Sequence, residues 1–385
     1  PGRIRITDWI RARFQGGKIP ADGKNPGGFV KGRGGKLMVA RNPLWMEHEQ
    51  ITIAEALKPA GYVSCHIGKW HLGPDQYYPD KQGFDFNHGG CDYGQPPSYF
   101  DPYTNRRLKQ GIPTLKPRKK GEYLTDREAD EAVRFIRQHK NKPFFLYLAN
   151  YAVHTPIQAK KDLKQKYQKL PKKGQKSAAY AAMVESVDHA IGRITQTLEE
   201  EKIADRTMII FTSDNGGLSR YTNNAPLRAG KGYAYEGGIR VPLIVKWPGV
   251  IKPGATSDEP AISCDFMPTI LEATANKPLD GQVIDGISLV GHLKSGGAEK
   301  LGREAIYWHF PHYRHKPGPY SIVRSGDFKL IKFYEGPTFE LYNLKDDLSE
   351  KKNLAGAMPE KVKSLDARLA SHLKSIDALV PHPPK

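Results

Sequence analysis

The sequence predicts an α/β protein in which a mainly parallel central sheet is flanked by helices and followed by a small C-terminal α+β subdomain. Three times along the chain a helical segment precedes a short apolar strand, and polar residues follow that strand at once. This alternation is typical of parallel strands, because their connections need a crossover that is usually a helix. After residue 302 short strands follow one another closely. We therefore expect a main domain over residues 1–302 and a subdomain over residues 303–385.

The first helix–strand unit ends in a lysine and a histidine. Thr52–Ala60 is predicted as a short helix, because it is followed by Gly61 and glycine is typical of a helix C-terminus. Tyr62–Ile67 has the apolar pattern of a buried strand. Lys69 and His71 follow this strand and are two residues apart, so an extended backbone would point both side chains the same way. They either supply a cation and an imidazole to one pocket or are a surface lysine and a packed histidine.

The second unit ends in another histidine. Residues 125–128, Thr-Asp-Arg-Glu, have the pattern of a capping box and are predicted to begin a helix. Pro143–Ala149 is the predicted strand, and His154 lies just past its carboxyl end. A lone histidine in such a place is more often structural than catalytic, so the pattern alone leaves both interpretations open.

The third unit ends in two oxygen donors. The helix Ser177–Lys202 precedes it, with apolar residues at steps of three and four that predict a core-facing stripe. The strand Met208–Phe211 then leads into Asp214 and Asn215, whose side-chain oxygens are hard ligands that suit Ca²⁺ or Mg²⁺. Sites in open α/β sheets lie beyond the carboxyl ends of strands, and Lys231 follows in a glycine-rich loop. The simpler alternative is a strand, a loop and a further strand over residues 241–247 with polar residues by chance.

The remaining segments are predicted from their turn residues and short apolar runs. Pro1–Gly35 and Tyr78–Arg118 are rich in glycine or proline and are predicted to be irregular. Gly281–Gly302 is predicted as a loop that closes the main domain. Short strands and a closing helix are expected at Ala305–Phe310, Tyr320–Arg324, Phe328–Tyr334, Phe339–Leu344 and Met358–Leu373.

The composition fits a folded, basic protein. The 385 residues carry a formal net charge of +18, mainly from scattered lysines, and 38% are hydrophobic. A nucleic-acid-binding protein is one interpretation, but the sequence has no helix-turn-helix, no RNA-binding strand pair and no zinc module. A surface that favours a polyanionic substrate, such as a sulfated polysaccharide, is the other. No apolar run approaches the roughly 20 residues of a membrane span, and the three cysteines match no zinc or redox spacing.

Two multi-residue motifs stand in the chain in order. The first is Gly61-Tyr62 followed by Gly-Lys-Trp-His-Leu-Gly at residues 68–73. The second runs from Ser213 to Gly249 and contains Ser-Asp-Asn-Gly, Gly-Lys-Gly, Glu-Gly-Gly-x-Arg-Val-Pro and Trp-Pro-Gly. In these motifs the chain resembles the sulfatases of the alkaline-phosphatase superfamily, from Pro1 to about Leu354. The resemblance implies an alkaline-phosphatase-like fold and the hydrolysis of a sulfuric ester, of the EC 3.1.6 type.

The resemblance also assigns roles to the candidate residues. It places Lys69 and His71 in the pocket for the sulfate and the nucleophile, and it favours a catalytic His154, because the family has a histidine there. A calcium ion, or magnesium, held by Asp214 and Asn215 would polarise a sulfate oxygen and lower the pKa of the nucleophile. Lys231 would surround the remaining sulfate oxygens with Lys69 and His71, and His154 or Lys231 would protonate or stabilise the leaving oxygen.

The chain departs from the family at the nucleophile. Family sulfatases begin with a strand that ends in two adjacent aspartates, and later have Cys-x-Pro-x-Arg or Ser-x-Pro-x-Arg, whose first residue becomes formylglycine. Here the only Asp-Asp pair is Asp346-Asp347, and no cysteine or serine fits that pattern. Because Pro1-Gly2-Arg3 resembles the residues after the nucleophile in the family, we expect a preceding segment that carries formylglycine. The chain as given is predicted to be inactive, and evolutionary loss of that segment is the alternative.

Two other functional classes stay open at this stage. A phosphatase or phosphodiesterase of the same superfamily would typically use two zinc ions with several His and Asp ligands, and the two motifs favour a sulfatase over it. A non-catalytic, sulfated-glycan-binding pseudoenzyme is the other alternative. The resemblance implies a sulfated carbohydrate or aryl sulfate as substrate, no nucleic-acid partner and a periplasmic or extracellular location. It leaves the sugar and the oligomeric state open.

Overall fold

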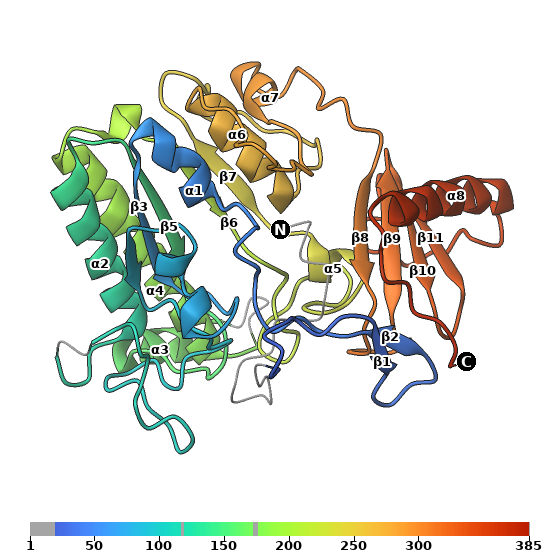
Figure 1. Cartoon of the computed structure of the whole chain (residues 1–385), viewed down its shortest axis with the longest axis horizontal. Helices are drawn as coiled ribbons and strands as arrows, with labels where there is room; N and C mark the ends of the chain where they lie inside the picture. Colours follow the sequence, from blue (N-terminus) through green and yellow to red (C-terminus); the bar gives the residue numbers. More distant parts are fainter. Residues whose placement is uncertain (1–19, 117–118, 172–175, 385) are drawn as a thin grey trace.

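A parallel sheet packed against helices forms the first part of the molecule, and an antiparallel sheet forms the C-terminal part (Figure 1). The computed structural model describes residues 20–116, 119–171 and 176–384. In the parallel sheet β3 lies between β4 and β5 and pairs in parallel with both, so the predicted α/β class is confirmed. The strands of this sheet are β3 (Val63–Gly68), β4 (Phe86–His88) and β5 (Phe144–Ala149).

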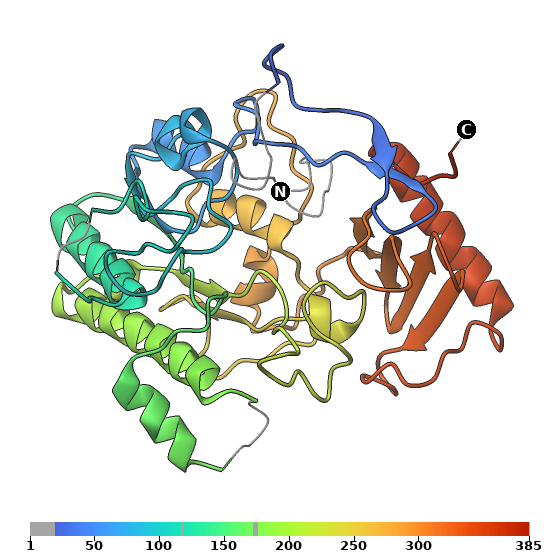
Figure 2. The same ribbon diagram turned by 90° about the horizontal axis from the view of Figure 1, so that it is seen from below.

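Helices cover this sheet through apolar faces. On α2, Ala132 and Phe135 pack against Cys65 and Ile67 of β3, and α4 lies beside α2 (Figure 2). The expected helix at Thr52–Ala60 is present as α1 followed by a 3₁₀ turn that ends at the left-handed Gly61. The helices of this part are α1 (Ile53–Leu57), α2 (Leu124–His139), α3 (Lys161–Lys169) and α4 (Ala178–Glu200).

The long helix α4 confirms its prediction with one local exception. The hydroxyl of Ser177 caps the helix by accepting a hydrogen bond from the backbone N–H of Tyr180. Met183 and Leu198 are buried, as the apolar stripe predicts. Val184, the next apolar residue of the same helix, is 48% exposed. Neighbouring residues are about 100° apart on a helix, so the burial of Met183 leaves Val184 at the edge of the packed face.

A separate antiparallel pair of strands carries the third unit. Within the described residues, β6 pairs only with β7, and β5 pairs only with β3. The segment Gly281–Gly302, predicted as a loop, contains the short helix α7. That prediction is wrong because Leu289 and Val290 are buried and the Leu289 N–H donates to the hydroxyl of Thr269. These elements are β6 (Ile209–Thr212), α5 (Glu236–Ile239), β7 (Leu243–Lys246), α6 (Phe266–Ala273) and α7 (Val290–Lys294).

The C-terminal sheet is antiparallel with the order β11-β10-β9-β8, and helix α8 lies along one face of it (Figure 1). Leu365, Leu369 and Leu373 of α8 pack against buried residues of β9, β10 and β11, which confirms the predicted small sheet and closing helix. The opposite face packs on Ala234 and Tyr235 beside α5. The elements are β8 (Ile306–Phe310), β9 (Tyr320–Ser325), β10 (Phe328–Phe333), β11 (Phe339–Asn343) and α8 (Pro359–Ser375).

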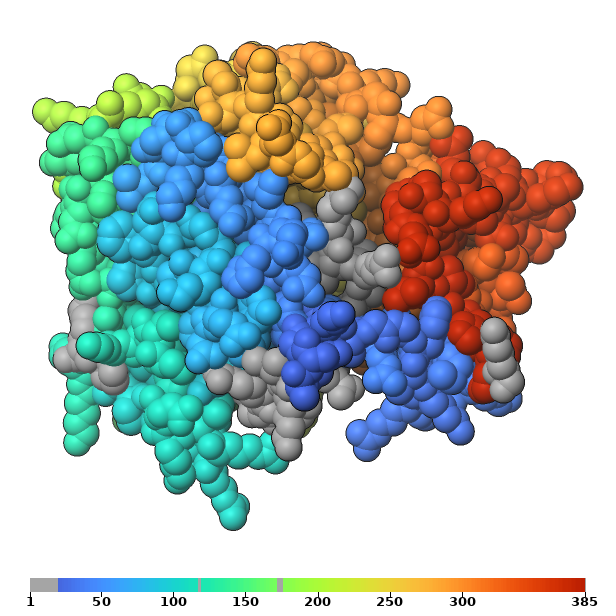
Figure 3. Space-filling model, viewed as in Figure 1, coloured from blue at the N-terminus to red at the C-terminus, as the bar shows by residue number. Residues whose placement is uncertain are grey.

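A hairpin from the beginning of the described chain lies beside the C-terminal sheet (Figures 1 and 3). Its strands are β1 (Phe29–Lys31) and β2 (Met38–Ala40), so the irregular conformation predicted for Pro1–Gly35 is wrong at β1. Residues 1–19 of that prediction lie outside the described residues. The hairpin is held by a two-way backbone pairing of Met38 with His382 and by an edge contact of the Phe29 and His382 rings. These partners are distant in the sequence, which is why local pattern did not reveal the strand. In the described chain no helix is long and apolar enough to cross a membrane.

A buried ion cluster fastens α5 to the C-terminal sheet. The ammonium of Lys329, which has no exposed surface, lies 2.9 Å from Glu236 and 2.8 Å from Glu350. Glu350 also accepts a hydrogen bond of 2.7 Å from the backbone N–H of Glu236. Burial raises the pKa of the Glu350 carboxyl, although Lys329 acts in the opposite direction. Glu236 of the Glu-Gly-Gly motif therefore has a structural partner in β10.

Replacing Lys329 with methionine is expected to lower the free energy of unfolding by about 3–5 kcal/mol, because it leaves two buried carboxyl groups without their cation. The measurement is the urea midpoint and slope of the variant beside those of Lys363→Met, which removes an exposed lysine from α8. An unfolding midpoint of Lys329→Met equal to that of the control would show that this cluster contributes little to stability.

Candidate active site

Lys69 lies where the ends of β3 and β5 meet. Gly68, the last residue of β3, has a φ of 92°, and a Cβ there would lie 2.1 Å from the carbonyl oxygen of Ala149. Only glycine therefore allows the two backbones to approach so closely. The next N–H, of Lys69, donates a 2.7 Å hydrogen bond to that same carbonyl. This pairing directs the half-buried Lys69 to the carboxyl edge of the parallel sheet.

His71 reaches the same edge by a different backbone path from the one predicted. Its φ is 58°, so the backbone is left-handed and the extended conformation expected between Lys69 and His71 is wrong. Its N–H donates to the carbonyl of Cys91 at 2.8 Å, and this long-range bond fixes the turn. A Cβ on Gly94 would lie 2.6 Å from the His71 ring, so the ring fits against a glycine.

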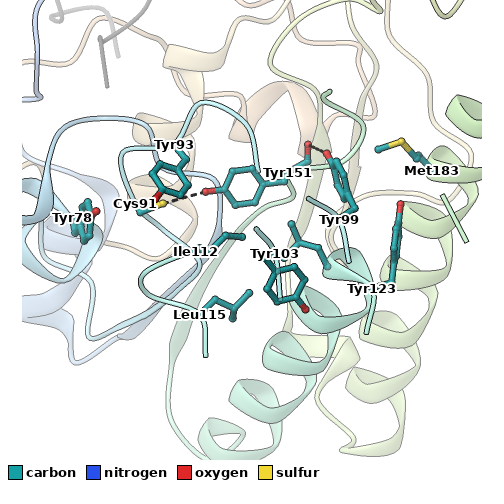
Figure 4. Packing of buried hydrophobic residues seen from close by; sticks show 11 residues of the cluster. Tyr78, Cys91, Tyr93, Tyr99, Tyr103, Ile112, Leu115, Tyr123, Tyr151 and Met183 are labelled. Carbon is teal, nitrogen blue, oxygen red and sulfur yellow. Dashed lines mark hydrogen bonds between the residues drawn. The ribbon is translucent and has the colours of Figure 1, made fainter. Parts of the chain in front are cut away.

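A cluster of buried tyrosines holds the loop that carries His154 (Figure 4). The hydroxyl of Tyr99 lies 2.6 Å from the carbonyl oxygen of Tyr151 and 2.9 Å from that of His154. The hydroxyl of Tyr151 in turn donates to the carbonyl of Gly89 at 3.1 Å. The segment Tyr78–Arg118, predicted to be irregular, thus contributes β4 and a buried aromatic core. Its many tyrosines were the sequence signal for that core.

The two halves of the second motif pack on each other. Gly216, after β6, donates from its N–H to the carbonyl of Gly238 at 3.1 Å, and a Cβ there would lie 1.8 Å from the carbonyl oxygen of Gly237. Lys231 donates from its N–H to the carbonyl of Gly217 at 3.1 Å. The turn that carries Asp214 therefore also positions Lys231. This explains why the motif has glycines at both places.

The structure brings five of the predicted residues into one electrostatic neighbourhood. Burial lowers the pKa of Lys69, and the charge of Lys231 lowers it further, whereas Asp214 raises it. Burial also lowers the pKa of Lys231, again opposed by Asp214. The pKa of His71 falls to about 3 and that of His154 to about 4, first through burial and then through the two lysines and, for His71, through His154. At neutral pH the imidazoles of His71 and His154 are therefore uncharged, and they share this neighbourhood with Lys69, Lys231 and the exposed Asp214.

Asp214 and Asn215 offer oxygen ligands of the kind that calcium and magnesium prefer. The amide nitrogen of Asn215 donates to the carbonyl of Gly216 at 3.4 Å, so its amide oxygen is the atom suited to a cation. In residues 20–116, 119–171 and 176–384, however, no group of three or more His, Cys, Asp and Glu side chains could hold a metal ion. The donor chemistry fits a hard cation, but two donors fall short of the roughly six to eight ligands of calcium.

Glu128, predicted as the last residue of a capping box, is a buried carboxyl group that contacts the loop of His154. The expected capping box is wrong, because α2 begins at Leu124 with Tyr123 as N-cap and has no side-chain cap. The carboxyl of Glu128 instead accepts a 3.2 Å hydrogen bond from the N–H of Tyr151. Burial raises its pKa to about 8. The pairing with Tyr151 makes it a support for the loop of His154.

Replacing Glu128 with glutamine is expected to make the protein more stable than the wild type at pH 8 but not at pH 4. The folded carboxyl has the higher pKa, so the folded state binds more protons between about pH 4.5 and pH 8, and stability falls as pH rises through that window. In this window the free energy of unfolding of the wild type falls by about 1.4 kcal/mol for each pH unit, up to a few kcal/mol in all. Urea midpoints at several pH values measure it, with Glu272→Gln on the exposed side of α6 as control. An identical pH dependence in wild type and Glu128→Gln would contradict the assignment.

Comparison with known proteins places this arrangement in a family. The Sulfatase family model matches residues 44–276, and the model named N-sulphoglucosamine sulphohydrolase, C-terminal, matches residues 229–378. A sulfatase of Formosa agariphila is 33% identical, and the match covers 86% of this chain and 70% of that protein. Human arylsulfatase A is 29% identical over 94% of this chain and 79% of its own length. Human N-acetylgalactosamine-6-sulfatase is 34% identical over 65% of this chain but 49% of its own length, so the chain spans about half of that relative.

Solved structures give the same result. The crystal structure of Ps i-CgsB in complex with k-i-k-neocarrahexaose has a TM-score of 0.73 at 29% identity and covers 92% of this chain and 76% of that one. The phosphonate monoester hydrolase of Agrobacterium radiobacter has a TM-score of 0.60 at 20% identity, over 86% and 84% of the two chains, and this likeness concerns the fold alone. The matched ranges include both motifs that carry the candidate residues, and the chain belongs to the sulfatase family.

Proposed function

We propose that this chain is part of an enzyme that hydrolyses sulfate esters of carbohydrates. The observation that carries this proposal is the convergence of Lys69 and Lys231 with two neutral histidines at the carboxyl ends of β3 and β5 and beside β6. A half-buried pair of ammonium groups binds a small oxyanion strongly, because partial burial weakens the screening by water. The names of the relatives, which include an N-acetylgalactosamine-6-sulfatase, support a sulfated sugar as the substrate.

The protonation states of the two lysines and the two histidines give these side chains different roles. Lys69 and Lys231 bind sulfate oxygens and stabilise the negative charge that develops during attack at sulfur. His71 and His154 are neutral at pH 7, since their pKa values fall to about 3 and about 4, so they contribute hydrogen bonds rather than positive charge. Lys231 is then the better donor of a proton to the leaving oxygen, because its lowered pKa eases the release of that proton.

A metal ion and a covalent nucleophile complete the proposal. Asp214 and Asn215 would hold a calcium ion, or magnesium, together with ligands other than the described residues, and the ion would supply a Lewis acid. The 385 residues contain no Cys-x-Pro-x-Arg or Ser-x-Pro-x-Arg from which formylglycine arises in the family. We therefore propose that the nucleophile of the active enzyme is not among these residues.

We expect the 385-residue chain alone to release no sulfate from an aryl sulfate, because it contains no residue that matures to the formylglycine that attacks sulfur in the family. The test compares this chain with a longer version that carries a matured formylglycine segment before Pro1. The longer version should hydrolyse the aryl sulfate much faster than the matching aryl phosphate.

Three outcomes contradict parts of this proposal. Comparable turnover by the 385-residue chain would show that the nucleophile lies within it. Faster turnover of the phosphate would favour a phosphatase of the same fold. Binding of sulfated sugar without turnover by the longer version would favour a non-catalytic glycan-binding protein.

A further inference from the structure

A loop of the C-terminal subdomain reaches the residues around Lys231. It comprises residues 311–319, between β8 and β9. The ring of His315 stacks on that of Tyr233, with centroids 4.0 Å apart and an interplanar angle of 1°. Its Nε2 atom lies 3.3 Å from the carbonyl oxygen of Lys231. The loop therefore touches both the backbone of the candidate lysine and the residue two places after it.

Arg314 lies over the glycine that follows Lys231. A Cβ built on Gly232 would lie 2.4 Å from Nε and 2.7 Å from Cδ of Arg314, so the glycine makes room for the arginine side chain. Burial is the main cause of the lowered pKa of the Lys231 ammonium, and the charge of Arg314 lowers it further. Arg314 is itself exposed, so a dissolved ligand can reach it.

The loop is held from its other side by the N-terminal hairpin. The ring of Tyr313 fits between Gly32 and Gly35, where added Cβ atoms would lie 2.2 Å and 1.9 Å from ring carbons. Its hydroxyl donates to Glu335 and accepts a 3.0 Å hydrogen bond from the N–H of Leu37. Figure 2 shows the hairpin, in blue, running along the C-terminal sheet. Contacts on both flanks fix the backbone that presents Arg314.

The charges around the candidate site exceed what one sulfate ester needs. Among the residues that the structure describes, Lys69, Lys231 and Arg314 bring three positive charges, and Asp214 is the carboxylate that acts on both lysines. A sulfate monoester carries a single negative charge, which is less than the positive charge that these described residues bring. A substrate with a second negative group near the scissile sulfate would match this distribution better than a singly charged one.

We propose that Arg314 binds a second anionic substituent of the substrate, so that the preferred substrate is a sugar with a sulfate or carboxylate close to the sulfate that is removed. A guanidinium suits this task because its planar N–H groups can bind either oxyanion in a bidentate manner. The inference rests on the proposed function for the position of the scissile sulfate. It adds a specificity residue, supplied by the C-terminal subdomain, that does not take part in the chemistry.

Binding measurements on the 385-residue chain test this without any turnover. Titration calorimetry would compare a monosulfated monosaccharide with a disulfated one and with a monosulfated uronic acid. Arg314→Ala should weaken binding of both doubly charged sugars by about 10- to 100-fold, the usual range for a charged hydrogen bond, and change the monosulfated sugar less than about twofold. Arg314→Lys should retain part of the affinity. The control Lys363→Ala removes one charge from the exposed side of α8 and should leave all three affinities unchanged.

The outcomes separate this inference from the proposed function. Equal losses for the singly and doubly charged sugars, or no loss for either, would overturn the role of Arg314. A loss for only one of the doubly charged sugars would support the inference and decide between sulfate and carboxylate. Unfolding midpoints of the variants show whether Arg314→Ala acts through the fold. Aryl sulfate turnover by the longer, matured wild-type protein tests the proposed hydrolysis by itself, so a failure of that function would be recognised separately.

Discussion

Replacing Lys231 with alanine is expected to lower kcat/KM for an aryl sulfate by about 10²- to 10³-fold, the usual effect of removing one preorganised group that stabilises transition-state charge. The charges of Asp214 and Arg314 both act on the half-buried Lys231 ammonium, and its lowered pKa suits it to donate a proton to the leaving oxygen. The substitution keeps the N–H that donates to Gly217, so the loop should keep its conformation. The assay uses the longer, matured protein, because the 385 residues alone are expected to be inactive.

The leaving group makes this prediction specific. If Lys231 donates the proton, the loss should be larger for a poor leaving group, such as a sugar hydroxyl, than for a nitrophenol that departs without protonation. Lys231→Arg keeps the positive charge but cannot release a proton, so it should recover binding more than turnover. The exposed Lys363→Ala serves as control. A loss in Lys231→Ala that is the same for good and poor leaving groups would leave the lysine a role in binding only.

The sequence predicted the architecture well where a pattern is local. The alternation of helices and strands before Lys69, His154 and Asp214, the small antiparallel sheet and the long helix α4 follow from apolar periodicity and turn residues, and the structure confirms these elements. The strand ends at Lys69, His154 and Asp214 were predicted for the same reason, because polar residues directly after an apolar run mark the edge of a sheet. The roles of these residues in catalysis stay predictions.

Features set by distant contacts could not be predicted in this way. The left-handed turn at His71 depends on the carbonyl of Cys91, and the strand β1 accompanies a pairing of Met38 with His382. Glu128 has a favourable capping pattern, but burial against Tyr151 prevailed over that local preference. In each case the partner that decides the conformation lies on another element, so the local sequence around the residue does not identify it.

The second motif shows how a functional pattern can also be structural. Glu236 belongs to the motif that carries the family resemblance, and its carboxylate pairs with Lys329 in the C-terminal sheet, 93 residues away. Through α5 and Lys231 this pairing connects the candidate site to the subdomain that supplies Arg314. The C-terminal subdomain therefore helps to hold the loop that carries Lys231 and also contributes the neighbouring Arg314. The motif alone reveals neither contact.

Asp214→Asn is expected to abolish metal-dependent turnover and to weaken calcium binding by at least about 100-fold, because calcium affinity follows the number of charged oxygen ligands. The substitution keeps the size of the side chain but removes its charge. Calcium content by elemental analysis and calcium affinity by calorimetry provide readouts besides activity, with Asp205→Asn on the exposed turn before β6 as control.

The charges around Asp214 lead to a second expected result. This carboxylate raises the pKa of both Lys69 and Lys231, so its removal should lower both values further and make the lysines lose their protons at a lower pH. As the pH rises, sulfate binding by Asp214→Asn should therefore weaken at a lower pH than in the wild type, where both lysines stay charged up to a higher pH. Calorimetric titration of inorganic sulfate between pH 6 and pH 10 measures this shift, with metal absent from both proteins. Unchanged calcium affinity together with an unshifted pH profile would place Asp214 outside the site, because each readout depends on a different neighbour of the same carboxylate.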